Sequence, residues 1–322
     1  MPLWASPFLG ADWVAATHSS LGVIYKLGLP MMMHYLRQMF TDATPQLQSG
    51  QPLTAARAAV EGLVFGLGQG LPVSAGGQSF AWPYLLQRTA ILPGTDPGPW
   101  TVCLLAAAVG LAVVLRASWA GTWRSLRTRR AQAGAPEGVT LLAAVVACWL
   151  IQLRLGPWSL RFEAAAAVGL LLALTGQALN LSDRWGRQRT PSRGGGDRIP
   201  LWLALIGGLL AGFAALPGLS ALAILLAAGL YGRLSTEGAG RFALMTATGV
   251  LALQGLAGLP AAATQFHPAF LVLAAGAAVG AAAGGWLLLA LLRAAAQRAL
   301  PVMASYCTAL GGLLLMFGVL QR

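Results

Sequence analysis

The chain is poor in charged residues, and above all in acidic ones. Only 9% of its 322 residues are Asp, Glu, Lys or Arg, and nine of them are acidic. Because soluble domains carry about 25% charged residues, this scarcity excludes an ordinary soluble enzyme or binding module. With 57% hydrophobic residues and a mean hydropathy of +0.68, the composition predicts an integral membrane protein.

Lysine, cysteine and histidine are scarce as well. Lys26 is the single lysine, so the net charge of +12 comes almost entirely from arginine. The arginines gather in loops between apolar runs, which favours membrane orientation over nucleic-acid binding. Cys103, Cys148 and Cys307 lie far apart in apolar runs, and the three histidines form no ligand pattern. We therefore expect buried cysteines without disulfides, no metal site and no cofactor.

Residues 1–54 form an N-terminal extension of mixed character. Its apolar stretch, residues 21–40, contains Lys26, Arg37 and a central Pro30. This pattern is typical of an interfacial or partner-docked helix and not of a membrane span. We expect the extension to bind a membrane-protein partner.

The rest of the chain contains runs that are long and apolar enough to cross a bilayer, which takes about 20 residues. The arginine-rich loops 118–138 and 182–198 are predicted to be cytoplasmic, because two spans separate them. The predicted spans are residues 100–117, 139–155, 162–181, 242–259, 268–292 and 303–320.

Two further apolar regions are broken in the middle. The first break reads GLGQGLPVSAGGQ, residues 66–78, between apolar pieces 55–68 and 78–92 that are too short to span. The second lies in residues 199–234, and each break places a serine just after Leu-Pro. Three spans follow each break, and the breaks enter from opposite sides. This order predicts an all-α inverted repeat, with repeat 1 at 55–181 and repeat 2 at 199–322.

Broken backbone is tolerated in a bilayer only where protein or a water-filled cavity surrounds it. The two breaks are therefore predicted to be tips of re-entrant helical hairpins that pack against each other. Helices that start just after the tips would direct their N-termini at a shared centre, which attracts anions. Alternatively, the glycines serve only tight helix packing. The candidate lipid- or phosphate-binding residues are Gln69, Ser74, Gly76, Gly77, Gln78, Gly218 and Ser220.

Three sequence motifs carry a resemblance to a known family. They are FGLGQGLPVSAGGQ at 65–78, PGLSALAIL at 217–225 and GRLSTEGAGRFAL at 232–244. From about residue 55 onward the chain resembles the undecaprenyl-diphosphate phosphatase, or bacitracin-resistance, family. The resemblance implies two re-entrant hairpins in an inverted repeat, a bacterial inner membrane location and a polyprenyl phosphate-type lipid as ligand.

The residues that carry the family's chemistry are replaced. Phe65 and Gln69 stand where the family has glutamates, and Gln78 stands where it has a histidine. Ala221 replaces an arginine, and Ala75 and Leu222 replace serines. The family carboxylates are suited to hold a divalent metal, but Phe65 provides no oxygen ligand and Gln69 only a neutral amide.

Glu61 is the one catalytic candidate. It lies one helical turn before Phe65 on the same face, and a carboxylate within a membrane segment is a functional candidate. A structural role for Glu61 near the hairpin entrance is favoured, because no obvious basic partner lies nearby in the sequence. Glu163 is expected at the interface, and Arg233 and Arg241 are expected to be cytoplasmic anchors.

Three functional interpretations remain open. The substitutions favour a pseudoenzyme over an active phosphatase, and the N-terminal extension favours a non-catalytic accessory subunit of a membrane complex. In the second interpretation, the chain binds or moves a polyprenyl phosphate-type lipid. In the third, it is an active undecaprenyl-diphosphate phosphatase with an atypical site that uses Glu61.

Overall fold

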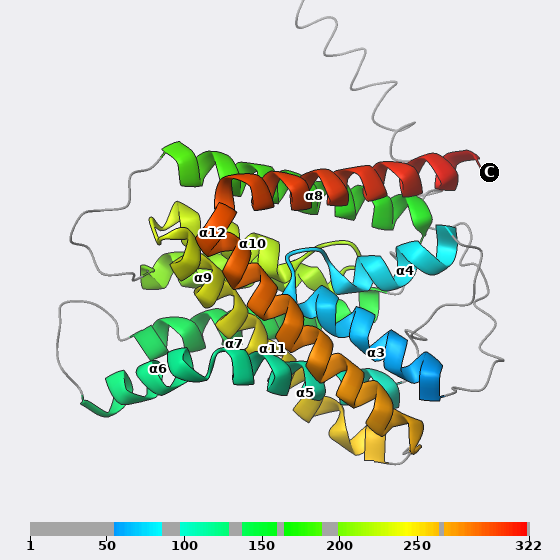
Figure 1. The fold of residues 1–322 in the computed structure, drawn as a ribbon, viewed down its shortest axis with the longest axis horizontal. Coiled ribbons are helices and arrows are strands. Elements are labelled where there is room, and N and C mark those ends of the chain that lie inside the picture. Colours follow the sequence, from blue (N-terminus) through cyan, green and yellow to red (C-terminus); the bar gives the residue numbers. More distant parts are fainter. Residues whose placement is uncertain are drawn as a thin grey trace, which may run out of the picture. The chain divides into compact units, whose positions relative to one another are not determined.

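The computed structural model describes residues 55–85, 97–128, 137–159, 164–188, 199–263 and 267–320. All of them belong to the unit Thr44–Arg322, and most of them form α-helices (Figure 1). The predicted all-α membrane fold is confirmed. The extension at 1–54 and Glu163 lie outside the described residues, so their roles stay predictions.

Each half of the chain contains a pair of short helices separated by a break. Helix α3 (Ala55–Gly70) is followed by α4 (Ala75–Leu85), and α9 (Leu201–Gly212) is followed by the 3-10 turn Phe213–Ala215 and α10 (Ala221–Tyr231). These helices have 11 to 16 residues. At about 1.5 Å per residue none of them crosses a hydrocarbon core of about 30 Å. They are the two predicted re-entrant hairpins.

Longer helices form the membrane-spanning part of the fold. Helices α7 (Glu137–Ser159), α8 (Ala165–Gln188) and α11 (Thr236–Ala263) are each long and apolar enough to cross a membrane. Helix α5 (Pro97–Val114) meets α6 (Arg116–Thr128) at a bend of 77°, and the two together are long and apolar enough to count as one bent span.

Helix α12 (Ala269–Leu320) is too long for a single crossing. Its 52 residues correspond to about 78 Å. The backbone leaves helical geometry at Ala295 (φ −154°, ψ 41°), and Figure 1 shows the orange first arm turning into the red second arm. The two arms match the spans predicted at 268–292 and 303–320. Counted separately, they bring the described spans to the predicted six.

The arginine-rich segments are more helical than predicted. Helix α6 occupies the first part of the predicted loop 118–138, and α8 continues to Gln188 within the predicted loop 182–198. The description of α6 as a loop is wrong: the segment is helical, with Trp119 packed against the core and Arg124 exposed, which are the two faces of an amphipathic helix. Its cytoplasmic location stays a prediction.

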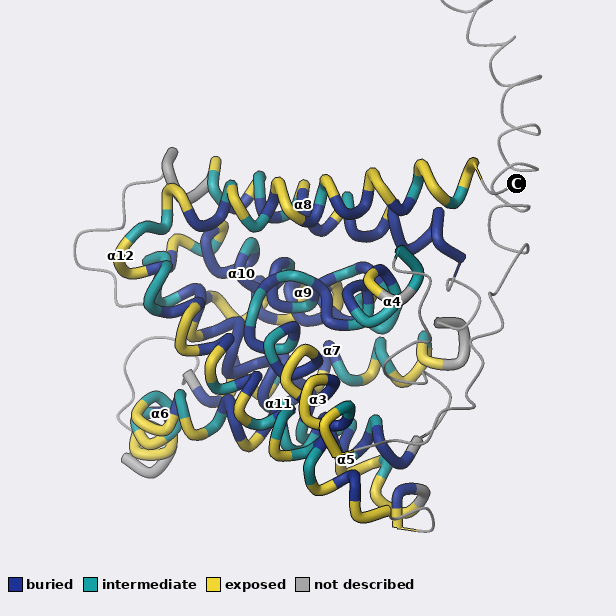
Figure 2. Tube along the Cα trace, turned by 45° about the vertical axis from the view of Figure 1, so that its right-hand side comes forward, coloured by how far each residue is buried: buried dark blue, intermediate teal, exposed yellow. Residues whose placement is uncertain are grey.

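The exposed surface of the bundle is largely apolar. Large hydrophobic side chains are exposed on α7 at Leu142, Leu150 and Leu153, and on α12 at Val279 and Trp286. Figure 2 shows helix turns that alternate between exposed positions in yellow and buried positions in dark blue. Such a surface is unfavourable in water and favourable against lipid chains.

Helix α3 and the first arm of α12 cross at very close range. A Cβ atom on Gly66 would lie 2.2 Å from the Ala277 carbonyl oxygen, and one on Gly280 would lie 2.3 Å from that of Leu63. Tight helix packing therefore explains Gly66 and Gly70, though not every glycine of the first break. On both helices the contact contains glycines spaced four residues apart. They are Gly62, Gly66 and Gly70 on α3, and Gly276, Gly280 and Gly284 on α12.

Substitution of Gly280 by alanine should separate these two helices. We expect Gly280→Ala to lower the stability by about 1–3 kcal/mol through overpacking, measured as a lower melting temperature of the detergent-solubilised protein. Gly312→Ala on the same helix is the matched control, since its added methyl group meets nothing within 4 Å. That control should be neutral or stabilising by up to about 1 kcal/mol. A Gly280→Ala protein that melts at or above the wild-type temperature would contradict the close crossing.

Candidate functional site

The two hairpin tips meet inside the helical bundle. A Cβ atom on Gly76 would lie 3.7 Å from the Cα of Pro217, and one on Gly77 would lie 2.9 Å from the Cα of Gly218. Gly218 has φ +106°, a conformation that a side chain would strain. The close neighbour of Gly77 is thus Gly218 of the second hairpin. The predicted contact between the tips is confirmed.

Each tip ends in a serine that caps the next helix. The Ser74 hydroxyl oxygen accepts a hydrogen bond from the Gly77 amide at 3.1 Å, and that of Ser220 accepts one from the Ala223 amide at 3.3 Å. Each serine thus serves the third residue of its helix, as an N-cap does. Ser74 caps α4, which starts at Ala75, directly after the first tip as predicted. Two capped helix N-termini therefore converge at the tips.

Helix α8 holds the second tip through a residue that the sequence did not single out. The Thr175 hydroxyl donates to the Gly218 carbonyl at 2.8 Å and accepts from the Ser220 amide at 3.1 Å. Leu172 of α8 packs against Gly77 of the first tip. A threonine within a membrane span was the available signal, since such hydroxyls bond between helices, but no motif marks Thr175.

Removal of the Thr175 hydroxyl should loosen the second tip. In Thr175→Val the Gly218 carbonyl and the Ser220 amide lose their partner at nearly constant volume, which should cost about 1–3 kcal/mol. We expect a lower melting temperature and faster amide hydrogen exchange across residues 216–223.

Thr248→Val is the matched control for this substitution. The Thr248 hydroxyl is also buried, but it donates only to the Leu244 carbonyl of its own helix at 2.7 Å. Equal losses of melting temperature in the two variants would show that the hydrogen bonds between Thr175 and the second tip do not stabilise the protein more than a hydroxyl bond within one helix does.

Gln78 lies one turn into α4 and is buried. Its Oε1 atom accepts hydrogen bonds from Trp82 Nε1 at 2.9 Å and from the Tyr306 hydroxyl at 2.5 Å. Tyr306 belongs to the second arm of α12, so this cluster ties the first hairpin to a distant helix. Gln69 lies half-buried in the last turn of α3.

The positions where the family has ionisable groups are filled by hydrophobic packing. Phe65 is 2% exposed and makes an edge contact with Trp100 of α5 at a centroid distance of 5.0 Å. Leu222 is buried in the same hydrophobic core, and Ala221 packs against it. These side chains add no charge to the tips.

Glu61 has a basic partner that the sequence did not suggest. Arg57 Nε lies 2.6 Å from Glu61 Oε1, one helical turn earlier on α3. The prediction that Glu61 has no basic partner nearby is therefore wrong, because a spacing of four residues places both side chains on one helix face. The Glu61 side chain is 2% exposed.

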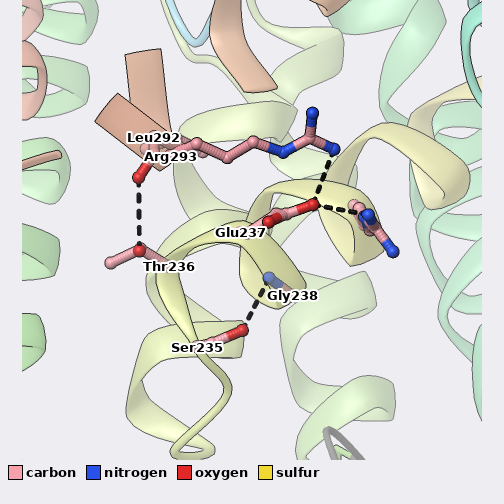
Figure 3. Close-up of polar contacts among 7 residues, drawn as sticks. Ser235, Thr236, Glu237, Gly238, Leu292 and Arg293 are labelled. Atoms are coloured by element: carbon pink, nitrogen blue, oxygen red, sulfur yellow. Dashed lines mark hydrogen bonds and ion pairs between the residues drawn. The ribbon is translucent and has the colours of Figure 1, made fainter. Parts of the chain in front are cut away.

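A second charged cluster lies at the start of α11. The Glu237 carboxylate contacts Arg241 of its own helix at 2.5 Å and Arg293, just before the kink of α12, at 2.7 Å (Figure 3). Ser235 caps α11 through the Gly238 amide at 3.0 Å. Arg241 is thus an ion-pair partner, and its role as a cytoplasmic anchor stays a prediction.

The described residues do not fit a resident divalent cation. Phe65 and Gln69 occupy the positions that resemble the family's carboxylates, and the described part of the chain contains no group of three or more His, Cys, Asp or Glu side chains. Hard divalent cations prefer several oxygen ligands. The three cysteines are free and buried, as predicted.

The fold and the paired tips define a multi-pass helical membrane protein with two re-entrant hairpins. The sequence profile described as "Bacitracin resistance protein BacA" matches residues 58–313. The chain belongs to this family, as its motifs predict.

Curated relatives agree with this assignment. The undecaprenyl-diphosphatase of Gluconacetobacter diazotrophicus is 31% identical over 208 residues, which cover 62% of this chain and 72% of the relative. The undecaprenyl-diphosphatase of Gemmatimonas aurantiaca is 28% identical over 267 residues, which cover 80% and 96%, respectively.

These relatives correct the predicted lack of activity. The substituted positions favour a pseudoenzyme, but both relatives carry the name of a hydrolase, so the preference for a non-enzyme is wrong. That preference rested on the substituted family positions, whereas the similarity to proteins named as hydrolases extends over most of the chain.

Proposed function

We propose that the chain binds a polyprenyl diphosphate lipid by its headgroup at the hairpin tips and hydrolyses it. One observation carries the proposal: two capped helix N-termini converge where Gly77 meets Gly218. The first amides of a helix have no intrahelical partner and carry a partial positive charge. Two such ends together suit a diphosphate better than one does.

The lipid surroundings suit the rest of such a ligand. The outer helix surfaces are apolar, so a polyprenyl chain can remain in the bilayer while its headgroup reaches the tips. Ser74 and Ser220 use their hydroxyl oxygens as acceptors in capping. Their hydroxyl protons are free by valence to be donated to a phosphoryl oxygen.

The Arg57–Glu61 pair supplies two of the groups that hydrolysis needs. A carboxylate can take a proton from the attacking water, and a guanidinium can offset charge on the transferring phosphoryl group. Water attacks the terminal phosphorus, the phosphoanhydride bond breaks, and polyprenyl phosphate and inorganic phosphate result. Glu61 lies about 13 Å along α3 from Gly70, so hydrolysis by this pair requires the headgroup to move from the tips along α3, and binding and hydrolysis are separate steps.

Glu61→Gln tests the assignment of this pair. We expect phosphate release from undecaprenyl diphosphate in nanodiscs to fall at least about 100-fold, while the Kd for the lipid changes less than about threefold. Release is measured with Mg²⁺, with Ca²⁺ and with a chelator. The matched control is Glu237→Gln, which removes a carboxylate from the surface ion pairs and should retain full activity.

Each contrary outcome removes a different part of the proposal. Wild-type protein that binds the lipid and releases no phosphate under any of these conditions would overturn hydrolysis. Normal release by Glu61→Gln would remove Glu61 from the chemistry and leave hydrolysis standing. Failure of the wild type to bind undecaprenyl diphosphate would overturn headgroup recognition itself.

Movement of the lipid across the bilayer is a second candidate function. The pairing of two broken hairpins at one centre is the arrangement that transporters of alternating access use around their substrates. In proteoliposomes, transfer of labelled undecaprenyl phosphate between leaflets at the rate of empty vesicles would exclude this function.

A further inference from the structure

The Gln78 amide is held in one orientation by two donors. Trp82 Nε1 and the Tyr306 hydroxyl both donate to Oε1, at 2.9 Å and 2.5 Å. An indole N–H can only donate, so the group that faces Trp82 must be the amide oxygen. The two protons of Nε2 are therefore directed away from Trp82 and Tyr306.

The Nε2 group is left without a partner by the described residues. Gln78 is 6% exposed, and its Nε2 atom is buried with no hydrogen-bond partner among the residues that the structure describes. The Thr308 hydroxyl, two positions after Tyr306 on α12, is likewise buried with no hydrogen-bond partner among the described residues. A buried donor without an acceptor is unfavourable, and most such groups in folded proteins are satisfied. An acceptor brought by a ligand would satisfy this one.

The place of Gln78 connects this donor with the hairpin tips. It follows Gly77, which touches Gly218, and its backbone amide bonds to the Ser74 carbonyl at 3.0 Å. The α4 N-terminus and the Gln78 amide thus offer donors from one helical turn. Both groups are hydrogen-bond donors, which suits an oxygen-rich anion.

We propose that Tyr306 and Trp82 are positioning residues that orient Gln78 so that its Nε2 donates to a phosphoryl oxygen of the lipid headgroup. This inference rests on the proposed binding of a polyprenyl diphosphate at the tips. It adds to that proposal the side chain that donates the hydrogen bond, Gln78, and two residues that act only by orienting Gln78. Tyr306 lies about 230 residues from the first tip and outside the family motifs, so sequence spacing does not indicate it.

The test measures binding of undecaprenyl diphosphate to the full chain in nanodiscs, with undecaprenol as the ligand that lacks the anion. Gln78→Leu should weaken binding of the diphosphate about tenfold or more, with undecaprenol unaffected. Tyr306→Phe and Trp82→Phe should each weaken it by a smaller factor, about three- to tenfold. Tyr231→Phe is the matched control: Tyr231 is 41% exposed and Tyr306 37%, and the control should bind as the wild type does.

A double-mutant comparison separates positioning from a merely structural role. If Tyr306 acts through Gln78, then Tyr306→Phe has no further effect in a Gln78→Leu background. Gln78→His, which keeps one ring nitrogen to accept and one N–H to donate, should restore binding to within about threefold of the wild type. Gln78→Glu can still accept both hydrogen bonds but replaces the donor by an anion, so it should bind at least as weakly as Gln78→Leu. Melting temperatures identify any variant that fails to fold.

The failures are distinguishable. If the losses in affinity from Gln78→Leu and Tyr306→Phe multiply in the double variant, the positioning role is overturned. It is also overturned if the wild type binds the lipid and every variant binds it with the same affinity. Diphosphate binding that is retained by Gln78→Glu would show that Nε2 faces no phosphoryl oxygen. Wild-type protein without affinity for undecaprenyl diphosphate would overturn the proposed function, and this inference with it.

Discussion

The structure depends on how broken backbone is satisfied within a bilayer. The chain interrupts two helices at Leu-Pro, and each interruption exposes amide and carbonyl groups where no water is at hand. Three hydroxyl groups resolve most of this difficulty: Ser74 and Ser220 cap the following helices, and Thr175 bonds both a carbonyl and an amide of the second tip. The two tips also pack directly against each other. Each hairpin thus supplies the protein environment that the other one requires.

Helix α12 keeps this arrangement together over the whole bundle. Its first arm crosses α3 through paired glycines, and its second arm packs along α8, where Gly169 and Gly311 again allow backbone contact. Since α3 leads into the first tip and α8 holds the second, the kink at Ala295 lets one helix support both. The Glu237 carboxylate joins the start of α11 to Arg293 beside that kink (Figure 3). Surface ion pairs contribute little individually, so the glycine contacts account for more of the stability.

The neutral character of the tips shapes the chemistry proposed for them. The family profile and two curated relatives place the chain among the undecaprenyl-diphosphatase-like membrane proteins. Yet Phe65 and Ala221 bring hydrophobic packing to positions where the family has a glutamate and an arginine. In the proposed function, anion recognition is therefore assigned to helix ends, hydroxyls and the Gln78 amide. A charged pair lies further along α3, where the partly exposed Arg57 contacts the buried Glu61.

Sequence alone determined the class of protein and the places where its helices break. Scarce charge and long apolar runs required a bilayer, and two Leu-Pro breaks followed by serine located both hairpins, because proline and unsatisfied backbone act locally. It also located Ser74, Gly77, Gln78, Gly218 and Ser220 at the tips. These statements depend on neighbours in the chain, which is why composition and spacing were sufficient for them.

Only the tertiary structure decided which distant residues complete the site. Thr175 reaches the second tip from α8, and Tyr306 reaches Gln78 from the far arm of α12. It also showed that α12 is kinked and that the Gly66 and Gly280 surfaces fit each other. Contacts of this kind depend on how helices cross, which is set by the fit of complete helix surfaces, and no local pattern in the sequence encodes such a fit.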